Sequence, residues 1–149
     1  MKAIRFAAVA AVALAFGLGS PAMAASEYPF EPGQYVEVSG ISIDDGHDLD
    51  YARHLAGMWR KGQDYAKAQG WIAGYEILYN VYKRKGEPDV YLLTRFTTFA
   101  DKAEEQRRDE AYRAYMQQTD TQAQAAAGQR ATYRHLSGSM LLRSMDWKK

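Results

Sequence analysis

The sequence contains no cysteine among its 149 residues. This absence excludes a disulfide framework, a cysteine-ligated zinc or iron–sulfur site, a thiol nucleophile and a lipid-modified lipoprotein cysteine. Proline is also scarce, with four residues, while 47% of the residues are hydrophobic and 25% are charged. That composition is typical of a globular protein of about one domain. We therefore expect one domain that is stabilised by burial of apolar side chains.

Signatures of catalysis and of nucleotide binding are missing as well. No glycine-rich loop follows a predicted strand, so nucleotide binding has no support. The segment Ser137-Gly138-Ser139 is not the G-x-S-x-G nucleophile elbow and instead predicts a turn. The sequence therefore leaves open whether the protein is an enzyme.

The first 24 residues have the pattern of a signal peptide. Lys2 and Arg5 precede an uncharged run over residues 6–19, which ends in Pro21 and Ala22-Met23-Ala24. The run is shorter than the roughly 20 residues that a membrane-spanning helix needs. We expect cleavage after Ala24, a periplasmic or secreted product, and no stable membrane insertion after cleavage.

The mature chain would lack an excess of positive charge. Removing the two basic residues of the signal peptide leaves 17 basic against 18 acidic residues, a net charge of about −1. A nucleic-acid partner requires basic groups that release counterions from phosphates. We therefore expect no nucleic-acid partner.

The first half of the mature chain predicts a strand, a helix and a hairpin. After an extended leader at residues 25–33, alternating side chains predict a strand at 34–43. Apolar residues at helical spacing predict a helix from about 48 to 69, which Gly70 would end as a left-handed cap. Two runs rich in Tyr, Ile, Leu and Val, residues 71–82 and 89–98, predict a β-hairpin around a polar turn.

The second half predicts two helices and a last strand. Asp101 with Glu104 forms a capping-box pattern that opens a helix. A weaker repeat of this pattern at Thr119 predicts a break and a third helix to about Leu136, which Gly138 would end. Residues 140–147 alternate and predict the final strand. The resulting β-α-β-β-α-(α)-β order is that of the ferredoxin-like fold. We expect one α+β domain over residues 34–149, with a four-stranded antiparallel sheet and helices on one face.

The order and lengths of these elements resemble the dimeric α+β barrel superfamily. The resemblance rests on the first strand with Tyr35-Val36-Glu37-Val38, the long helix containing Trp59, the hairpin of two long strands and the final strand with Leu141-Leu142-Arg143. It implies a homodimer in which two sheets face each other, with ligands between sheet and helices. The superfamily includes cofactor-free monooxygenases, NIPSNAP-like proteins and some haem enzymes.

The hairpin supplies most of the candidate site residues. If its apolar faces pair, Glu76 and Arg95 lie on the same side of adjacent strands, close enough to form a charge-assisted hydrogen bond among tyrosines. Such a pair suits either a polar anchor in an apolar site or an ion pair in a dimer interface. We expect the ligand site beside Trp59, Tyr75 and Arg95.

His54 is a further candidate, on the first helix. His47 and His54 are seven residues apart, which is too far for two ligands of one metal ion. We therefore expect no metal site. His54 would be either a partly buried polar residue or a single axial ligand of a haem.

These observations give one functional hypothesis and one alternative. The hypothesis is an exported, dimeric protein that holds a small apolar or aromatic ligand without a cofactor, with or without enzymatic activity. Its candidate ligand-binding residues are Trp59, Tyr75, Glu76, Arg95 and His54. The alternative is a non-catalytic structural or interaction protein whose aromatic residues form the core and the dimer interface.

We expect the dimer to form through one face of the sheet, which is too apolar to face water. This face carries Tyr35, Leu78, Tyr82, Tyr91 and Leu93.

Overall fold

The computed structural model describes residues 27–149, so the predicted signal peptide lies outside the described residues. In chain order the elements are β1 (Phe30–Ile43), α1 (Asp48–His54), the π-helical segment η1 (Leu55–Trp59), α2 (Arg60–Ala68), β2 (Gly74–Tyr79), β3 (Val90–Phe96), α3 (Lys102–Met116), α4 (Asp120–Arg130) and β4 (Arg134–Trp147). None of the helices in this part of the chain is long and apolar enough to span a membrane.

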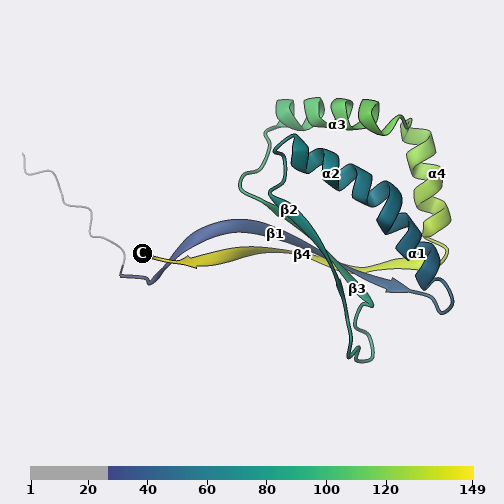
Figure 1. Cartoon of the computed structure of the whole chain (residues 1–149), viewed down its shortest axis with the longest axis horizontal. Coiled ribbons are helices and arrows are strands. Elements are labelled where there is room, and N and C mark those ends of the chain that lie inside the picture. Colours follow the sequence, from purple (N-terminus) through teal and green to yellow (C-terminus); the bar gives the residue numbers. More distant parts are fainter. Residues whose placement is uncertain (1–26) are drawn as a thin grey trace, which may run out of the picture.

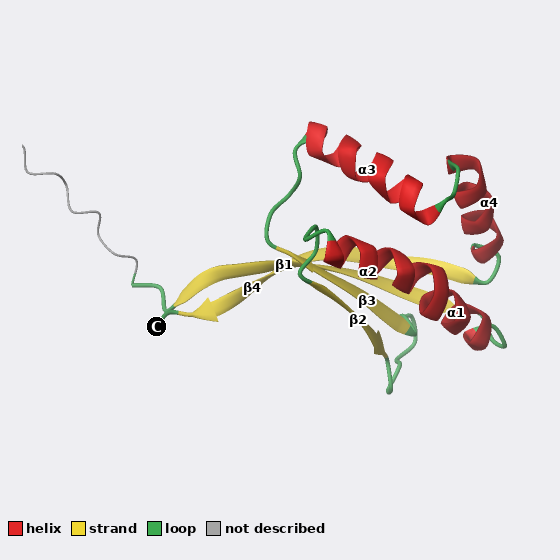
Figure 2. Ribbon diagram, turned by 45° about the horizontal axis from the view of Figure 1, so that its top comes forward, coloured by secondary structure: helices red, strands yellow, loops and turns green. Residues whose placement is uncertain are grey.

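The four strands form one antiparallel sheet in the order β2-β3-β1-β4. This order and the β-α-β-β-α-α-β sequence of elements confirm the predicted ferredoxin-like α+β fold. The helices all lie on one side of the sheet (Figures 1 and 2). Both views also place α3 farther from the sheet than α2, so the helices form two levels and do not lie side by side.

The strand registers assign each side chain to one face of the sheet. The helix-covered face carries the side chains of Ile41 and Val90, which pair with each other. Because side chains alternate along a strand, their neighbours point to the opposite side, here called the open face. The apolar side chains of the open face are Val36, Val38, Leu78, Tyr91, Leu93, Met140 and Leu142.

Tyr35 does not belong to the open face, and this part of the prediction was wrong. It pairs with Phe96 and has the same parity in β1 as Ile41, which lies under the helices. Its ring stacks on Phe96 at a centroid distance of 5.6 Å and lies 4.9 Å from the ring of Phe99. Tyr82 follows the end of β2 and is almost fully exposed in the turn.

The first and last strands of the chain are longer than predicted, and they pair with each other over this added length. β1 begins at Phe30, which pairs with Trp147, so part of the predicted leader is strand. β4 begins at Arg134, where the sequence predicted a helix to Leu136. Gly138 therefore lies inside β4, next to a register shift between Gly40 and Ile41, and its φ is 159°. The predicted turn at residues 137–139 is this irregular part of the strand.

The predicted first helix forms, but with a π-helical turn in its middle. The Arg60 N–H donates to the Leu55 carbonyl five residues earlier, which is the π-type hydrogen bond. Gly70 has a φ of 72° and follows the helix end, as predicted for a left-handed cap. Among the other predicted caps, Asp101 accepts from the Glu104 N–H at 2.8 Å, and Thr119 forms a complete capping box with Gln122.

The core between the helices and the sheet is small. Among the described residues, the buried cluster consists of Ile41, Tyr51, Leu55 and Val90. Val38 and Leu93 of the two inner strands are also buried, although they lie on the open face. A single chain thus leaves much of its apolar sheet surface outside the core.

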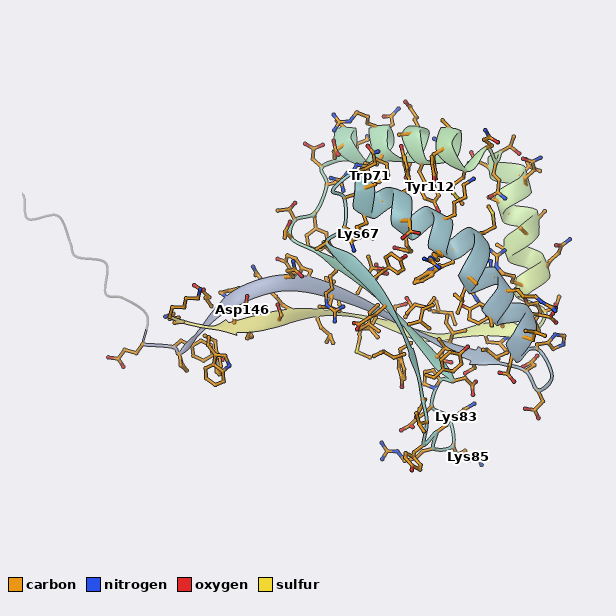
Figure 3. All side chains as sticks on the ribbon, in the orientation of Figure 1. Lys67, Trp71, Lys83, Lys85, Tyr112 and Asp146 are labelled. Carbon is orange, nitrogen blue, oxygen red and sulfur yellow. The ribbon has the colours of Figure 1, made fainter. Side chains whose placement is uncertain are left out.

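Aromatic side chains attach α3 to α2. Tyr65 of α2 stacks on Tyr115 at 4.0 Å and contacts Trp71 edge-on at 5.3 Å. Tyr112 lies between the two helices (Figure 3), where a Cβ atom on Gly62 would collide with its hydroxyl group. A glycine at position 62 therefore permits the close approach of α3 to α2. Tyr65, Tyr112 and Tyr115 thus pack the two helices together.

Candidate functional site

A groove of about 470 Å³ lies between the helix α1-η1-α2 and the edge strand β2. This volume lies within the range of roughly 300–1,000 Å³ that is usual for small-molecule sites. Its lining is mainly apolar and consists of Ala52, Leu55, Ala56, Trp59, Arg60, Tyr75, Ile77 and Tyr79. We call it the edge groove.

The π-helical turn supplies three of the residues that line the edge groove. Leu55, Ala56 and Trp59 all belong to η1. The Trp59 ring packs edge-on against Tyr75 of β2, with centroids 5.2 Å apart. π-Helical turns are rare and often occur at functional sites. The π-helical turn therefore forms part of the wall of the edge groove.

One end of the edge groove is polar. The Tyr75 hydroxyl donates to Asp64 Oδ1 at 2.5 Å, and Arg60 Nε lies 3.5 Å from Asp64 Oδ2. The hydrogen bond to Asp64 raises the pKa of the Tyr75 phenol. Both oxygen atoms of Asp64 are thus engaged, and the phenol keeps its proton at neutral pH.

His54 lies in a different cavity, of about 310 Å³, between η1 and the α3–α4 pair. Burial, together with the positive charges of Arg130 and Arg134, lowers the pKa of His54 to about 4. The imidazole is therefore neutral at physiological pH. Trp59 lines both this cavity and the edge groove.

The cavity beside His54 does not fit the haem alternative. Its volume is at the lower end of the range for small-ligand sites, and a porphyrin is much larger than such a ligand. Haem could enter only if α3 and α4 moved away from η1. We therefore derive no role for His54 through haem.

Glu76 and Arg95 lie together on the open face. The pairs Gly74–Arg95 and Glu76–Leu93 make the two charged residues diagonal neighbours, and Arg95 Nη1 is 2.6 Å from Glu76 Oε2. This confirms the predicted hairpin register. In a single chain the side chains are 36% (Arg95) and 49% (Glu76) exposed, so the pair is only partly shielded.

The five predicted site residues therefore do not form one site. Trp59 and Tyr75 meet in the edge groove, and His54 lines the neighbouring cavity. Glu76 and Arg95 are separated from them by the sheet, so the predicted pocket beside Trp59, Tyr75 and Arg95 was wrong. The reason is the strand period of two, which sends Tyr75 and Glu76 to opposite faces.

The polar contacts at the end of the edge groove, made by Arg60 and by Asp64 behind Tyr75, were not predicted from the sequence. Arg60 and Asp64 are four residues apart on α2, and this spacing was a usable signal for a pair on one helix face. Nothing in the sequence placed Tyr75 against them, because that contact joins a helix to a strand.

The other histidines are each held by a single carboxylate. His47 Nδ1 lies 3.2 Å from Asp50 Oδ2, and His135 Nε2 lies 3.0 Å from Asp44 Oδ1. Within residues 27–149, no group of three or more His, Asp or Glu side chains is arranged to hold a metal ion.

Comparison with known proteins assigns the chain to no family. No protein-family model and no curated protein matches the chain. One similar solved structure is that of a dimeric ferredoxin-like protein from an uncultured marine organism. It shares 15% sequence identity, the match covers 80% of this chain and 99% of that chain, and the TM-score is 0.39.

Proposed function

We propose that the protein binds a small apolar or aromatic ligand in the edge groove. The observation that carries this proposal is that the π-helical turn η1 and exposed apolar side chains of the edge strand β2 line the same groove. Ile77 and Tyr79 of β2 face the groove and remain partly or largely exposed. Large apolar side chains that line a concave site and stay in contact with water favour an apolar ligand.

The polar end of the groove would orient the ligand. Arg60 offers guanidinium N–H donors to a carbonyl or hydroxyl group, while Asp64 fixes the Tyr75 ring through their hydrogen bond. Because both Asp64 oxygens are engaged, this carboxylate is poorly placed to act as a free base. The proposal is therefore limited to binding.

Filling the groove tests this function. N-Phenyl-1-naphthylamine, a neutral aromatic probe, is expected to bind with enhanced fluorescence, and Ala56→Trp should weaken its binding by at least about tenfold. Ala56 is an exposed residue at the groove wall, so the larger side chain should obstruct the groove without entering the core. Fluorescence titration gives both dissociation constants.

Ala103→Trp is the matched control for this experiment. Ala103 is exposed on α3, outside the edge groove, and the substitution adds the same fluorophore to a helix surface. It should leave probe affinity unchanged. Equal affinities of the two tryptophan variants for the probe would contradict ligand binding in the groove.

We also propose that the protein is a homodimer associated through its open face. Leu78, Met140 and Leu142 are each about half exposed there in a single chain. An apolar sheet face of this kind marks a protein interaction site. A second copy is the occupant we propose, because the face also carries the Glu76–Arg95 pair, whose charges are matched within each chain.

Export of the mature chain is part of the same proposal. The basic start, uncharged run and Ala-x-Ala end of residues 1–24 support cleavage after Ala24. The expected product begins at Ala25 and appears outside the cytoplasm. Intact-mass analysis of fractionated cells measures this, and a membrane-bound product that retains Met1 to Ala24 would contradict it.

A further inference from the structure

The cavity beside His54 carries an excess of positive charge that the proposed function does not use. Arg130 at the end of α4 and Arg134 at the start of β4 both line it. Its described lining residues include no carboxylate. Neither guanidinium belongs to an ion pair within residues 27–149. We call this site the arginine cavity.

Both arginines also have an unsatisfied donor. The Nε atoms of Arg130 and Arg134 are buried and have no hydrogen-bond partner within the described part of the chain. A buried donor without a partner is uncommon, and a bound ion is one of its explanations. These two atoms have almost no accessible surface, and the Arg134 guanidinium also lies 5.9 Å from the centroid of the Tyr51 ring. What favours a negatively charged ligand is that both guanidiniums line one cavity that has no carboxylate among its described lining residues.

The remaining walls of the arginine cavity are largely apolar. Met58 and Trp59 of η1, Tyr112 of α3 and Ala126 of α4 line it. Burial raises the pKa of Tyr112, so its phenol is also neutral. A ligand that fits this lining would have one anionic group and an apolar body.

We propose that the arginine cavity binds a small organic carboxylate with an apolar body, held by the guanidinium groups of Arg130 and Arg134. A planar guanidinium matches the two oxygen atoms of a carboxylate, and such charge-assisted hydrogen bonds are stronger than neutral ones. The neutral imidazole of His54 adds no charge of its own at physiological pH and offers one N–H donor. This site is separate from the edge groove, although Trp59 lines both.

Calorimetric titration with benzoate at fixed ionic strength tests the proposal. The full mature protein should bind benzoate but not benzamide, which has nearly the same shape and no charge. Arg130→Gln and Arg134→Gln should each weaken benzoate binding by at least about tenfold. Binding of benzamide as tight as that of benzoate would overturn the proposal, and so would an absence of benzoate binding.

Arg53→Gln is the matched control. Arg53 lies next to His54 on α1, but its side chain is exposed, it pairs with Asp50, and it does not line the cavity. Benzoate affinity should be unchanged in this variant and in Ala56→Trp, which obstructs only the edge groove. If Arg53→Gln weakens benzoate as much as Arg130→Gln does, the effect is general surface charge and the proposal is wrong. If Ala56→Trp abolishes benzoate binding, benzoate binds in the edge groove and the proposal is also wrong.

Discussion

We expect the unmodified protein to be a dimer at micromolar concentrations and the Met140→Glu variant to be a monomer. Met140 lies on the open face in the edge strand β4, opposite Val38 of β1, and is 51% exposed in a single chain. In the proposed dimer a carboxylate at this position would be buried without a partner, which costs several kcal/mol. We expect the dissociation constant to rise at least about 100-fold, which corresponds to roughly 2.7 kcal/mol.

Leu141→Glu provides a closely matched control. Leu141 is the next residue of β4, it is also 51% exposed, and its side chain points to the opposite side of the sheet. The two variants therefore have the same charge and a similar loss of apolar surface, and they differ in the face that they alter. Sedimentation velocity should show a dimer for Leu141→Glu and a monomer for Met140→Glu. A dimer in both cases, or a monomeric unmodified protein, would contradict association through the open face.

The dimer proposal also gives the Glu76–Arg95 pair a role that differs from ligand binding. In one chain this pair is about half exposed, and an exposed ion pair contributes less than about 1 kcal/mol. A partner sheet would remove water from both groups, and each would then depend on the other for its hydrogen bonds. The 2.6 Å contact between them means that neither charge would enter the interface alone.

The hairpin was predictable because strand alternation is a local property. Glu76 and Arg95 fall at positions whose parity is fixed by the apolar residues around them, and only one parity of pairing joins the apolar faces. The ferredoxin-like order follows in the same way from short, regular segments. Both predictions used local patterns along the chain and required no knowledge of contacts between distant elements.

The candidate site was less predictable because it depends on contacts between elements. Tyr75 and Glu76 both looked suited to a ligand, yet neighbouring strand residues cannot share one face. The π-helical turn has no signature in the spacing of Leu55 and Trp59, which also fits an ordinary helix. Nor did the spacing show that α3 lies on α2, which depends on packing between Tyr112 and Gly62.

The start of β4 shows how a long-range pairing overrides a local pattern. Residues from Thr119 to Leu136 predicted one helix, but α4 ends at Arg130. His135 and Leu136 instead pair with Ser42 and Ile41 of β1, about 90 residues earlier in the chain. Arg134 is therefore the first residue of β4, and it lines the same cavity as Arg130 at the end of α4.

Acid is expected to destabilise the protein through His54 at pH values well above those at which most carboxylates protonate. The imidazole ring stacks near Tyr51 at 5.9 Å, and the charged groups that act on it are Arg130 of α4 and Arg134 of β4. From α3, the titratable group of the cavity is the neutral phenol of Tyr112. Nothing in this environment favours a protonated imidazole.

The direction of this pH effect on stability follows from the lowered pKa of His54. Burial first, and then the two guanidiniums, lower the pKa of His54 from 6.5 to about 4 in the folded protein. Between these values the unfolded chain binds a proton that the folded chain does not, so the free energy of unfolding decreases as the pH falls. The stabilisation is complete above pH 6.5 and is lost as the pH falls toward 4. At 1.36 kcal/mol per pKa unit the full shift corresponds to about 3 kcal/mol, and solvent screening of this partly buried imidazole reduces the expected loss to about 1–2 kcal/mol.

Urea unfolding at pH 7, 6, 5 and 4.5, at one protein concentration, measures this effect. His54→Gln removes the titrating group, so its free energy of unfolding should change much less over this range than that of the unmodified protein. His135→Gln removes an imidazole that is 54% exposed on the surface, and this variant should keep the full pH dependence. Parallel curves for His54→Gln and the unmodified protein would show that His54 is not held in its neutral form by the fold, because a neutral, desolvated imidazole must make unfolding easier in acid.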